Sequence, residues 1–139
     1  MLTADEFVDN FEFLDDWDAR YAYLVELGEA LPPLDEALRT DEHRVQGCIS
    51  KVWVAPVADP QDPSRIRYVG DCDTAIIKGV LAVLIELMSG HTPREIEAMH
   101  IDALFERIKL AEHLSPNRHF GIYAIVELMK SQARDLAAR

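Results

Sequence analysis

The sequence has few cysteines: Cys48 and Cys72 are the only two among its 139 residues. Two thiols are too few for the disulfide framework of a small secreted protein, and neither belongs to a C-x-x-C motif. The N-terminal residues lack the apolar run of a signal peptide. The longest apolar stretch, residues 75–88, is too short to cross a bilayer. We therefore predict a cytoplasmic protein whose cysteines are reduced by default.

Basic residues are also scarce, with 14 lysines and arginines against 25 aspartates and glutamates and a net charge of −11. A chain this acidic repels nucleic acid and anionic membrane surfaces, so neither is an expected partner. High net charge usually serves solubility. A basic docking surface on a partner protein is the other interpretation that the charge leaves open.

Spacings typical of metal ligands are missing as well. The five histidines form no H-E-x-x-H or similar pattern. Asp71 and Asp73 lack the further oxygen ligands and central glycine of a calcium loop. We interpret one of these aspartates as the N-cap of the helix that follows, and Cys72 as a small residue packed at the helix entrance. Because no glycine-rich phosphate loop or G-x-S-x-G motif occurs either, we predict that the chain binds no metal or cofactor of its own.

What is present is an order of helices, then strands, then helices. Thr3 and Glu6 form a capping box that predicts a first helix. Asp15 or Asp16 predicts the start of a second helix, and Gly28 predicts its end. The middle of the chain then changes to residues that favour strands.

Strand-forming residues fill two stretches, 43–57 and 66–69. Gly47 interrupts the first, so we predict three short strands in an antiparallel sheet. Residues 75–88 are apolar around nearly the whole circumference of a helix, which predicts a buried helix. No linker divides the chain, so we predict a single two-layer α+β domain over residues 1–139, with helices packed on a small sheet.

Cys48 is the most informative residue for function. A cysteine among apolar residues is usually an inert part of the core. Here Gly47 breaks the strand pattern and predicts a turn, and polar neighbours place the thiol near solvent. His43, Arg44 and Lys51 bring positive charge close in sequence, which favours the thiolate if they are also close in space. The residues alone leave a reactive thiol and a buried small residue equally open.

Arg118 breaks a local rule. It falls in the first turn of the last predicted helix, which Ser115 and Pro116 open. A cation at that position opposes the helix dipole at a cost of some tenths of a kcal/mol. Such a violation marks either a functional residue or an arginine that reaches a nearby carboxylate, and both interpretations stay open.

Three motifs resemble signatures of the SufE-type sulfur acceptors. They are Val45-Gln46-Gly47-Cys48-Ile49-Ser50-Lys51-Val52-Trp53, Gly70-Asp71-Cys72-Asp73-Thr74-Ala75-Ile76-Ile77-Lys78-Gly79 and Leu114-Ser115-Pro116-Asn117-Arg118-His119-Phe120-Gly121. The segment Tyr23-Leu24-Val25-Glu26-Leu27-Gly28 is similar to the early helix of that family. The motifs keep the family's order over nearly the whole chain. One departure is Cys72, where the family usually has serine.

The resemblance implies both a fold and a function. The fold is the two-layer α+β form shared with the IscU and NifU scaffolds. A pyridoxal-phosphate cysteine desulfurase, of the SufS or CsdA type, would pass persulfide sulfur to Cys48, which would deliver it to an iron–sulfur scaffold. Gly47, Asp71 and Arg118 would support the cysteine. The chain would act as an accessory transfer protein, a monomer or weak homodimer, and the cofactor would belong to the desulfurase.

Two other functions stay open. A metal- or cluster-binding scaffold of the IscU or NifU type would need about four converging ligands, and the chain offers only two thiols. A non-catalytic acidic binding module would keep both cysteines in its core, where they would resist alkylation in the native protein.

Overall fold

The computed structural model of the chain describes residues 2–46, 50–114 and 116–138, with the backbone alone for Ala111 and residues 116–120. The elements in chain order, with η for a 3-10 helix, are α1 (Ala4–Phe13), α2 (Trp17–Glu29), η1 (Glu36–Leu38), η2 (Asp41–His43), β1 (Val52–Ala58), β2 (Ile66–Cys72), α3 (Ala75–Met88), α4 (Pro93–Glu97), α5 (Ile101–Arg107), η3 (Leu110–His113) and α6 (Pro116–Ala137).

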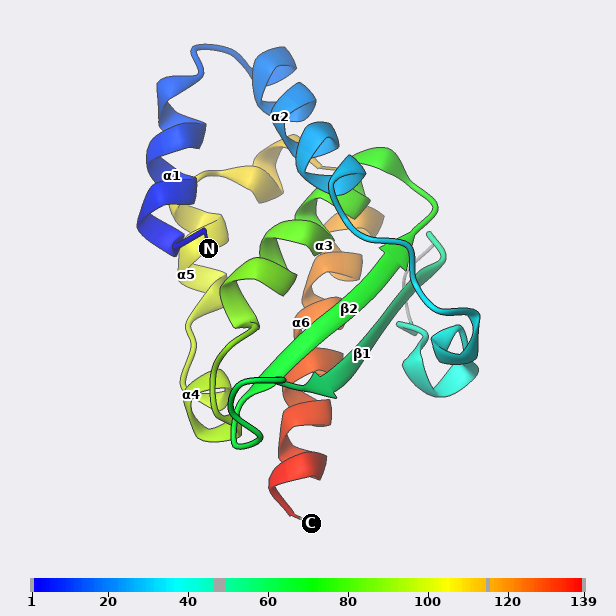
Figure 1. The fold of residues 1–139 in the computed structure, drawn as a ribbon. Coiled ribbons are helices and arrows are strands. Elements are labelled where there is room, and N and C mark those ends of the chain that lie inside the picture. Colours follow the sequence, from blue (N-terminus) through cyan, green and yellow to red (C-terminus); the bar gives the residue numbers. More distant parts are fainter. Residues whose placement is uncertain (1, 47–49, 115, 139) are drawn as a thin grey trace.

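Helix α3 is the central helix and spans the residues that its apolar pattern predicted. It packs against β2 and is crossed by α2, whereas α6 packs against β1. Figure 1 shows α3 and α6 beside the two strands, with α1 and α2 at one end of the molecule. Helices packed on a small antiparallel sheet confirm the predicted α+β fold class.

The sheet has two strands among the described residues, not the three that the sequence predicted. β1 and β2 pair antiparallel, with Val52 opposite Cys72. The stretch before them contributes a single antiparallel bridge, from Arg44 to Trp53. The reason is that η2 occupies the chain up to His43, which leaves too few residues for a ladder before the bridge.

The predicted N-caps of the first two helices are present. Thr3 Oγ1 accepts a hydrogen bond of 3.1 Å from the Glu6 amide, and Asp16 caps α2 in the same way. A reciprocal capping box of Thr92 and Glu95 opens α4. Local hydrogen bonding therefore decides where these helices begin.

Helices α2 and α3 cross at Gly28 and Gly79. A Cβ on Gly79 would overlap the carbonyl oxygen of Leu24, and a Cβ on Gly28 would lie 2.8 Å from the Gly79 nitrogen. Gly28 was predicted to end α2, and this prediction is wrong, because the helix continues to Glu29. The glycine instead allows the two helix backbones to touch.

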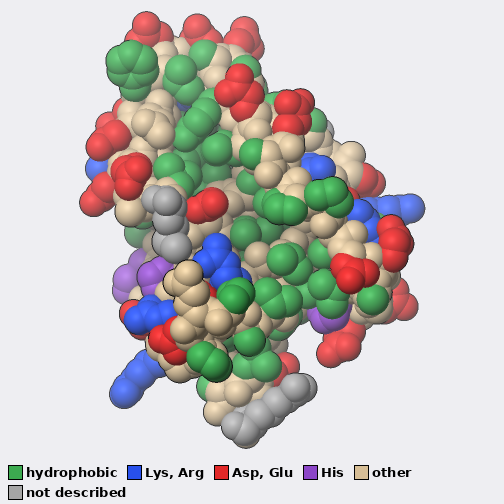
Figure 2. Space-filling view, viewed as in Figure 1, with side chains coloured by type: hydrophobic (Ala, Val, Ile, Leu, Met, Phe, Trp, Pro, Cys, Tyr) green, Lys and Arg blue, Asp and Glu red, His purple; other side chains and the backbone are tan. Residues whose placement is uncertain are grey.

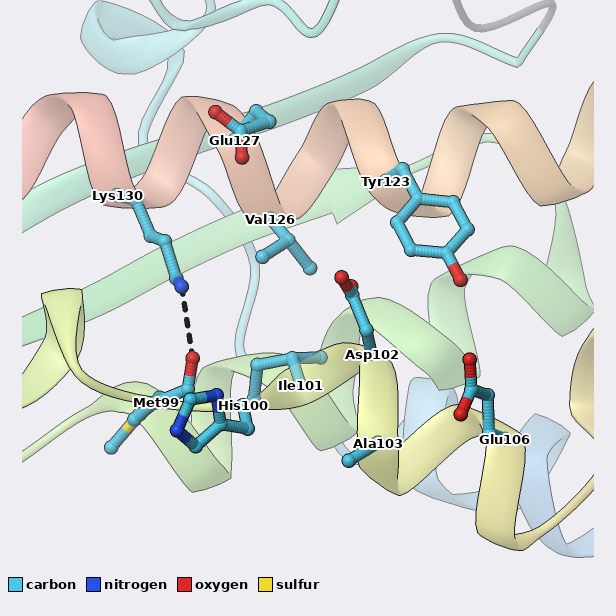
Figure 3. Close-up of a pocket in the computed structure, with 10 residues that line it drawn as sticks. All are labelled: Met99, His100, Ile101, Asp102, Ala103, Glu106, Tyr123, Val126, Glu127 and Lys130. Carbon is cyan, nitrogen blue, oxygen red and sulfur yellow. Dashed lines mark hydrogen bonds between the residues drawn. The ribbon is translucent and has the colours of Figure 1, made fainter.

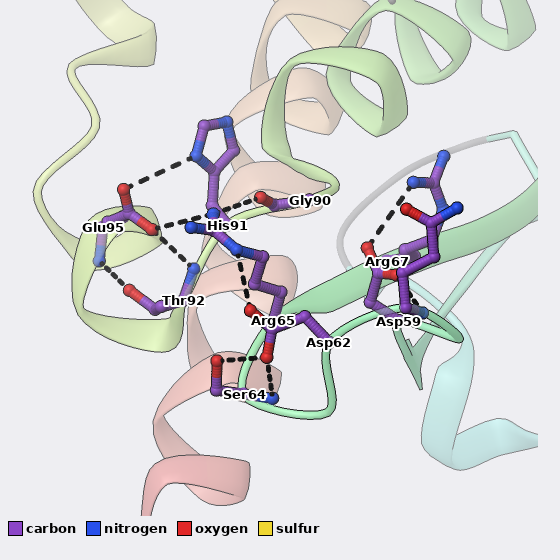
Figure 4. Close-up of polar contacts among 10 residues, drawn as sticks. Asp59, Asp62, Ser64, Arg65, Arg67, Gly90, His91, Thr92 and Glu95 are labelled. Carbon is purple, nitrogen blue, oxygen red and sulfur yellow. Dashed lines mark hydrogen bonds and ion pairs between the residues drawn. The ribbon is translucent and has the colours of Figure 1, made fainter.

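The loop between β1 and β2 is tied to the connection between α3 and α4 (Figure 4). Arg65 of this loop donates a hydrogen bond of 2.8 Å to the Gly90 carbonyl and lies 3.5 Å from the Glu95 carboxylate. It also pairs with Asp62 at 3.2 Å. These contacts fix the end of the sheet that is farthest from the Val52–Cys72 pair.

Both outer edges of the sheet are partly covered. On β1, the Val52 carbonyl accepts a hydrogen bond of 2.9 Å from the Val45 amide. The Val54 carbonyl accepts one of 2.8 Å from the Gln132 side chain. Pro56, further along the strand, has no N–H to offer. On β2, two amides donate to the segment that follows α3.

Candidate functional site

The residues predicted for the site fall into two groups. Gly47 and Cys48 lie outside the described residues. The backbone of Arg118 belongs to the first turn of α6, but its side chain also lies outside what is described. Asp71 lies near the end of β2. The site is therefore built from the residues that flank 47–49, which we call the stem, and from the connection between β2 and α3.

The stem, residues 45–46 and 50–52, is fastened to the β2–α3 connection. Ser50 Oγ and Thr74 Oγ1 share a hydrogen bond of 2.6 Å. The Lys51 amide donates to Asp73 Oδ1 at 2.9 Å, and the Asp73 amide donates to the Lys51 carbonyl at 3.1 Å. This double contact holds the C-terminal side of the stem against the entrance of α3.

Asp71 is the centre of an ion-pair cluster, and the prediction that Asp71 or Asp73 is the N-cap of α3 is wrong. The N-cap of α3 is Thr74, which makes no side-chain capping bond, and Asp73 holds the stem instead. Asp71 accepts a hydrogen bond of 2.5 Å from Arg39, lies 3.1 Å from Lys78 Nζ, and accepts from the next amide in the chain. The Asp71 carboxylate therefore binds Arg39 and Lys78 and does not cap the first turn of α3.

The cluster keeps Asp71 ionised. Its side chain is 22% exposed, and burial alone would raise its pKa. Hydrogen bonds from Arg39, Lys78 and the following amide outweigh burial and hold the pKa of Asp71 below its usual value. The carboxylate therefore remains charged near neutral pH and neutralises cations beside the stem.

Replacing Asp71 with asparagine should lower the free energy of unfolding by about 1–3 kcal/mol at pH 7, because Arg39 and Lys78 lose the charge that they share. Because the pKa of Asp71 is lower in the folded than in the unfolded state, its ionised carboxylate stabilises the fold fully at pH values above the unfolded-state pKa. This stabilisation is lost as the pH falls through the folded-state pKa, so the two proteins should converge in acid. Urea unfolding followed by circular dichroism at several pH values measures both effects.

Glu36→Gln is the matched control. Glu36 pairs with the same arginine at 3.2 Å, but its side chain is 88% exposed. Removing its charge should cost no more than about 0.5 kcal/mol. Equal costs for the two variants, or a difference between native protein and Asp71→Asn that does not change with pH, would contradict a stabilising role for the cluster.

An arginine–tryptophan cluster beside the stem was missed by the sequence analysis. The guanidinium carbon of Arg39 lies 5.1 Å from the ring centre of Trp53, and that of Arg44 lies 6.0 Å from it. These distances are typical of cation–π contacts. The available signal was alternation in β1, where buried Val52 and Val54 flank Trp53 and so place it on the other face. No spacing in the sequence indicated Arg39.

Cys72 is packed, as its position predicted. It ends β2 and has 6% of its surface exposed. Its sulfur accepts a hydrogen bond of 3.4 Å from the Thr74 amide at the entrance of α3. A small residue at this place joins the strand to the buried helix.

Metal ligands do not gather in the described part of the chain. No group of three His, Cys, Asp or Glu side chains there is placed to hold an ion. Because Cys48 lies outside this part, it remains a prediction that the chain binds no metal.

Acidic side chains lie over α1 and α2 on the face shown in Figure 2, in keeping with the net charge of −11. Positively charged side chains are fewer on this face. None of the helices in the described ranges has the length and apolar character needed to cross a membrane.

A pocket of about 380 Å³ lies between α5 and α6 (Figure 3). Asp102, Glu106 and Glu127 bring three carboxylates to its wall. Burial raises the pKa of Tyr123, and the charges of Asp102 and Glu106 add to this effect. Lys130 donates a hydrogen bond of 2.9 Å to a backbone carbonyl before α5. The described residues predicted for the site do not line this pocket.

The chain is similar to known proteins along nearly its whole length. The SufE family model, described as an Fe-S metabolism associated domain, matches residues 5–133. An uncharacterized SufE-like protein of Rhizobium etli is 39% identical over 140 residues, which cover 99% of this chain and 94% of that protein. A second, from Rhizobium meliloti, is 38% identical over 135 residues, which cover 96% of each chain.

A solved structure is similar in fold. The solution structure of a hypothetical protein from Thermus thermophilus matches with a TM-score of 0.79 at 18% identity. The match covers 98% of this chain and 96% of that one. At this level of identity the similarity shows the fold alone.

Proposed function

This chain belongs to the SufE family, whose domain is associated with Fe-S metabolism, and on that premise we propose that it accepts sulfur on Cys48 from a cysteine desulfurase. The chain then delivers this sulfur for iron–sulfur cluster assembly. The proposal is carried by the family match, which spans residues 5–133 and so includes the cysteine.

The transfer is a displacement at sulfur. The Cys48 thiolate attacks the outer sulfur of the donor's persulfide, as in thiol–disulfide exchange. A sulfur–sulfur bond forms on Cys48 while the donor's sulfur–sulfur bond breaks, and the donor cysteine leaves as a thiolate. One persulfide is exchanged for another, so no external oxidant or reductant is needed. The pyridoxal phosphate that releases sulfur from free cysteine belongs to the desulfurase.

The surroundings of the stem support this chemistry. Lys51 is exposed and Arg44 is half-buried, so cations flank the segment that carries the cysteine. Positive charge favours a thiolate, which is the attacking form. In the proposal Gly47 provides the turn, Asp71 balances the cations next to the stem, and Arg118 at the start of α6 meets the partner.

Adding the chain to its desulfurase should raise the rate of cysteine consumption several-fold, because the acceptor clears the persulfide that otherwise blocks the next turnover. The rate is measured against acceptor concentration, and chain whose thiols have been alkylated serves as the control. A rate that never rises would contradict the proposal. So would stoichiometric zinc or iron that is lost in the Cys48→Ala variant, which would favour a scaffold instead.

A further inference from the structure

We propose that Arg44 and Trp53 form a docking contact for an acidic group on the rim of the sulfur donor's active site. The inference rests on the proposed function and adds to it the chemistry of the partner surface. It depends on three observations: the arrangement of the two side chains, the unbalanced charge of one of them, and their place in the chain.

Arg44 and Trp53 are held together by backbone and side chain. They form an isolated antiparallel bridge, and the guanidinium carbon lies 6.0 Å from the ring centre. Both residues are half-buried, so each keeps part of its surface for a partner. An arginine held against a ring loses less conformational freedom on binding than a free one, since its planar group is already oriented.

The charge of Arg44 is unbalanced, unlike that of its neighbour on the same ring. Arg39 is neutralised by Asp71 and Glu36. Arg44 pairs with no carboxylate among the described residues, where its guanidinium has a cation–π contact with the tryptophan. A guanidinium without a partner at a half-buried position is well placed to take a carboxylate with two parallel hydrogen bonds.

Charge complementarity sets the kind of partner. The chain carries −11 overall, so an acidic partner is repelled by most of its surface. A carboxylate on the partner is attracted by cations, and Arg44 and exposed Lys51 are cations on either side of the segment that carries Cys48. Arginine and tryptophan are also the side chains that most often dominate the energy of protein interfaces. The occupant that fits is the aspartate or glutamate side chain of a protein.

The place of the contact suits delivery of sulfur. Arg44 lies four residues before Cys48 and Trp53 five residues after it. The Val45–Val52 hydrogen bond joins the two sides of the stem beside them. A partner that binds this pair therefore meets the segment of the chain that carries the acceptor cysteine.

The test is a charge reversal at Arg44. Arg44→Glu should raise the concentration of chain that half-saturates the desulfurase by roughly tenfold or more, with a smaller effect on the saturated rate. Arg44→Lys keeps the charge but not the planar group, so its half-saturating concentration should lie between those of the native chain and Arg44→Glu. Arg94→Glu is the matched control, because Arg94 is exposed on α4, away from the stem. Circular dichroism checks that each variant is folded.

Salt dependence gives a second measurement. Raising the ionic strength should weaken binding of the native chain, and this dependence should decrease in Arg44→Glu but not in Arg94→Glu. If Arg44→Glu, Arg94→Glu and the native chain half-saturate the desulfurase at the same concentration, the docking contact is wrong. The proposed function would still stand in that case, because the native chain stimulates the desulfurase. If the native chain itself fails to stimulate the desulfurase, the proposed function fails first.

Discussion

Cys48→Ala should accept no sulfur and yet fold like the native chain. The substitution removes the nucleophile, whereas the hydrogen bonds of Ser50 and Lys51 to the β2–α3 connection do not involve it. Because Gly47 and the polar neighbours predict an exposed turn, the cost in unfolding free energy should stay within about 0.5 kcal/mol. After incubation with desulfurase and cysteine, intact mass should show one added sulfur atom on the native protein, removable by a reductant, and none on the variant.

Cys72→Ser is the matched control for this experiment. Cys72 is buried with 6% of its surface exposed, so a hydroxyl there should cost about 1–2 kcal/mol of stability. The variant should nevertheless gain the same mass as the native protein. A gain of sulfur by Cys48→Ala would remove Cys48 from its central role. A loss of acceptance in Cys72→Ser comparable to that of Cys48→Ala would make Cys72 a second relay thiol.

Gly79→Ala should lower the free energy of unfolding by about 3 kcal/mol or more. Alanine is the better helix former, and on propensity alone the change would stabilise α3 by about 1 kcal/mol. The added methyl would instead meet the backbone of α2 at Leu24, which cannot move aside as a flexible side chain can. Urea unfolding of native and variant protein measures the difference.

Ala22→Gly supplies the control for helix propensity. Ala22 is exposed on α2, so its change to glycine should cost about 1 kcal/mol without any packing effect. Helix propensity alone predicts that Gly79→Ala stabilises the protein and that Ala22→Gly destabilises it. We expect the measured change in unfolding free energy to contradict propensity at Gly79 and to agree with it at Ala22. A Gly79→Ala protein as stable as the native one would show that the helices separate at little cost.

Local patterns predicted the elements whose stability is local. Residues 75–88 are apolar around nearly the whole circumference of a helix, and α3 has those bounds because most sides of such a helix are buried. Thr3 and Asp16 accept amide hydrogen bonds within their own first turns. In these capping contacts both partners lie within a few residues of sequence.

The predictions that were wrong depend on partners distant in sequence. Gly28 is a residue type typical of helix ends, but its position is decided by Gly79 on another helix. Either Asp71 or Asp73 was predicted to cap α3, but Arg39, which precedes the stem in sequence, binds the Asp71 carboxylate and Asp73 binds the stem. The first of the three predicted strands is a single bridge, because the residues before Arg44 form a 3-10 turn. Sequence spacing holds no information on such contacts.

The candidate site, like the fold, could be predicted only in part from the sequence. The motifs marked both segments that the structure joins, since Lys51 of the first bonds Asp73 of the second. What the motifs could not supply is the ring of Trp53 in contact with two guanidinium groups, because Arg39 lies outside every motif. A resemblance identifies positions, and contacts between side chains require the fold.

The covered edge of β1 has a consequence for the state of the protein in a crowded solution. Amyloid growth needs a strand that offers a continuous row of free N–H and C=O groups to the next chain. In β1, Val45 and Gln132 already occupy two carbonyls, and Pro56 interrupts the donors. The protein can thus keep this end of its sheet at the surface without offering a template for fibrils.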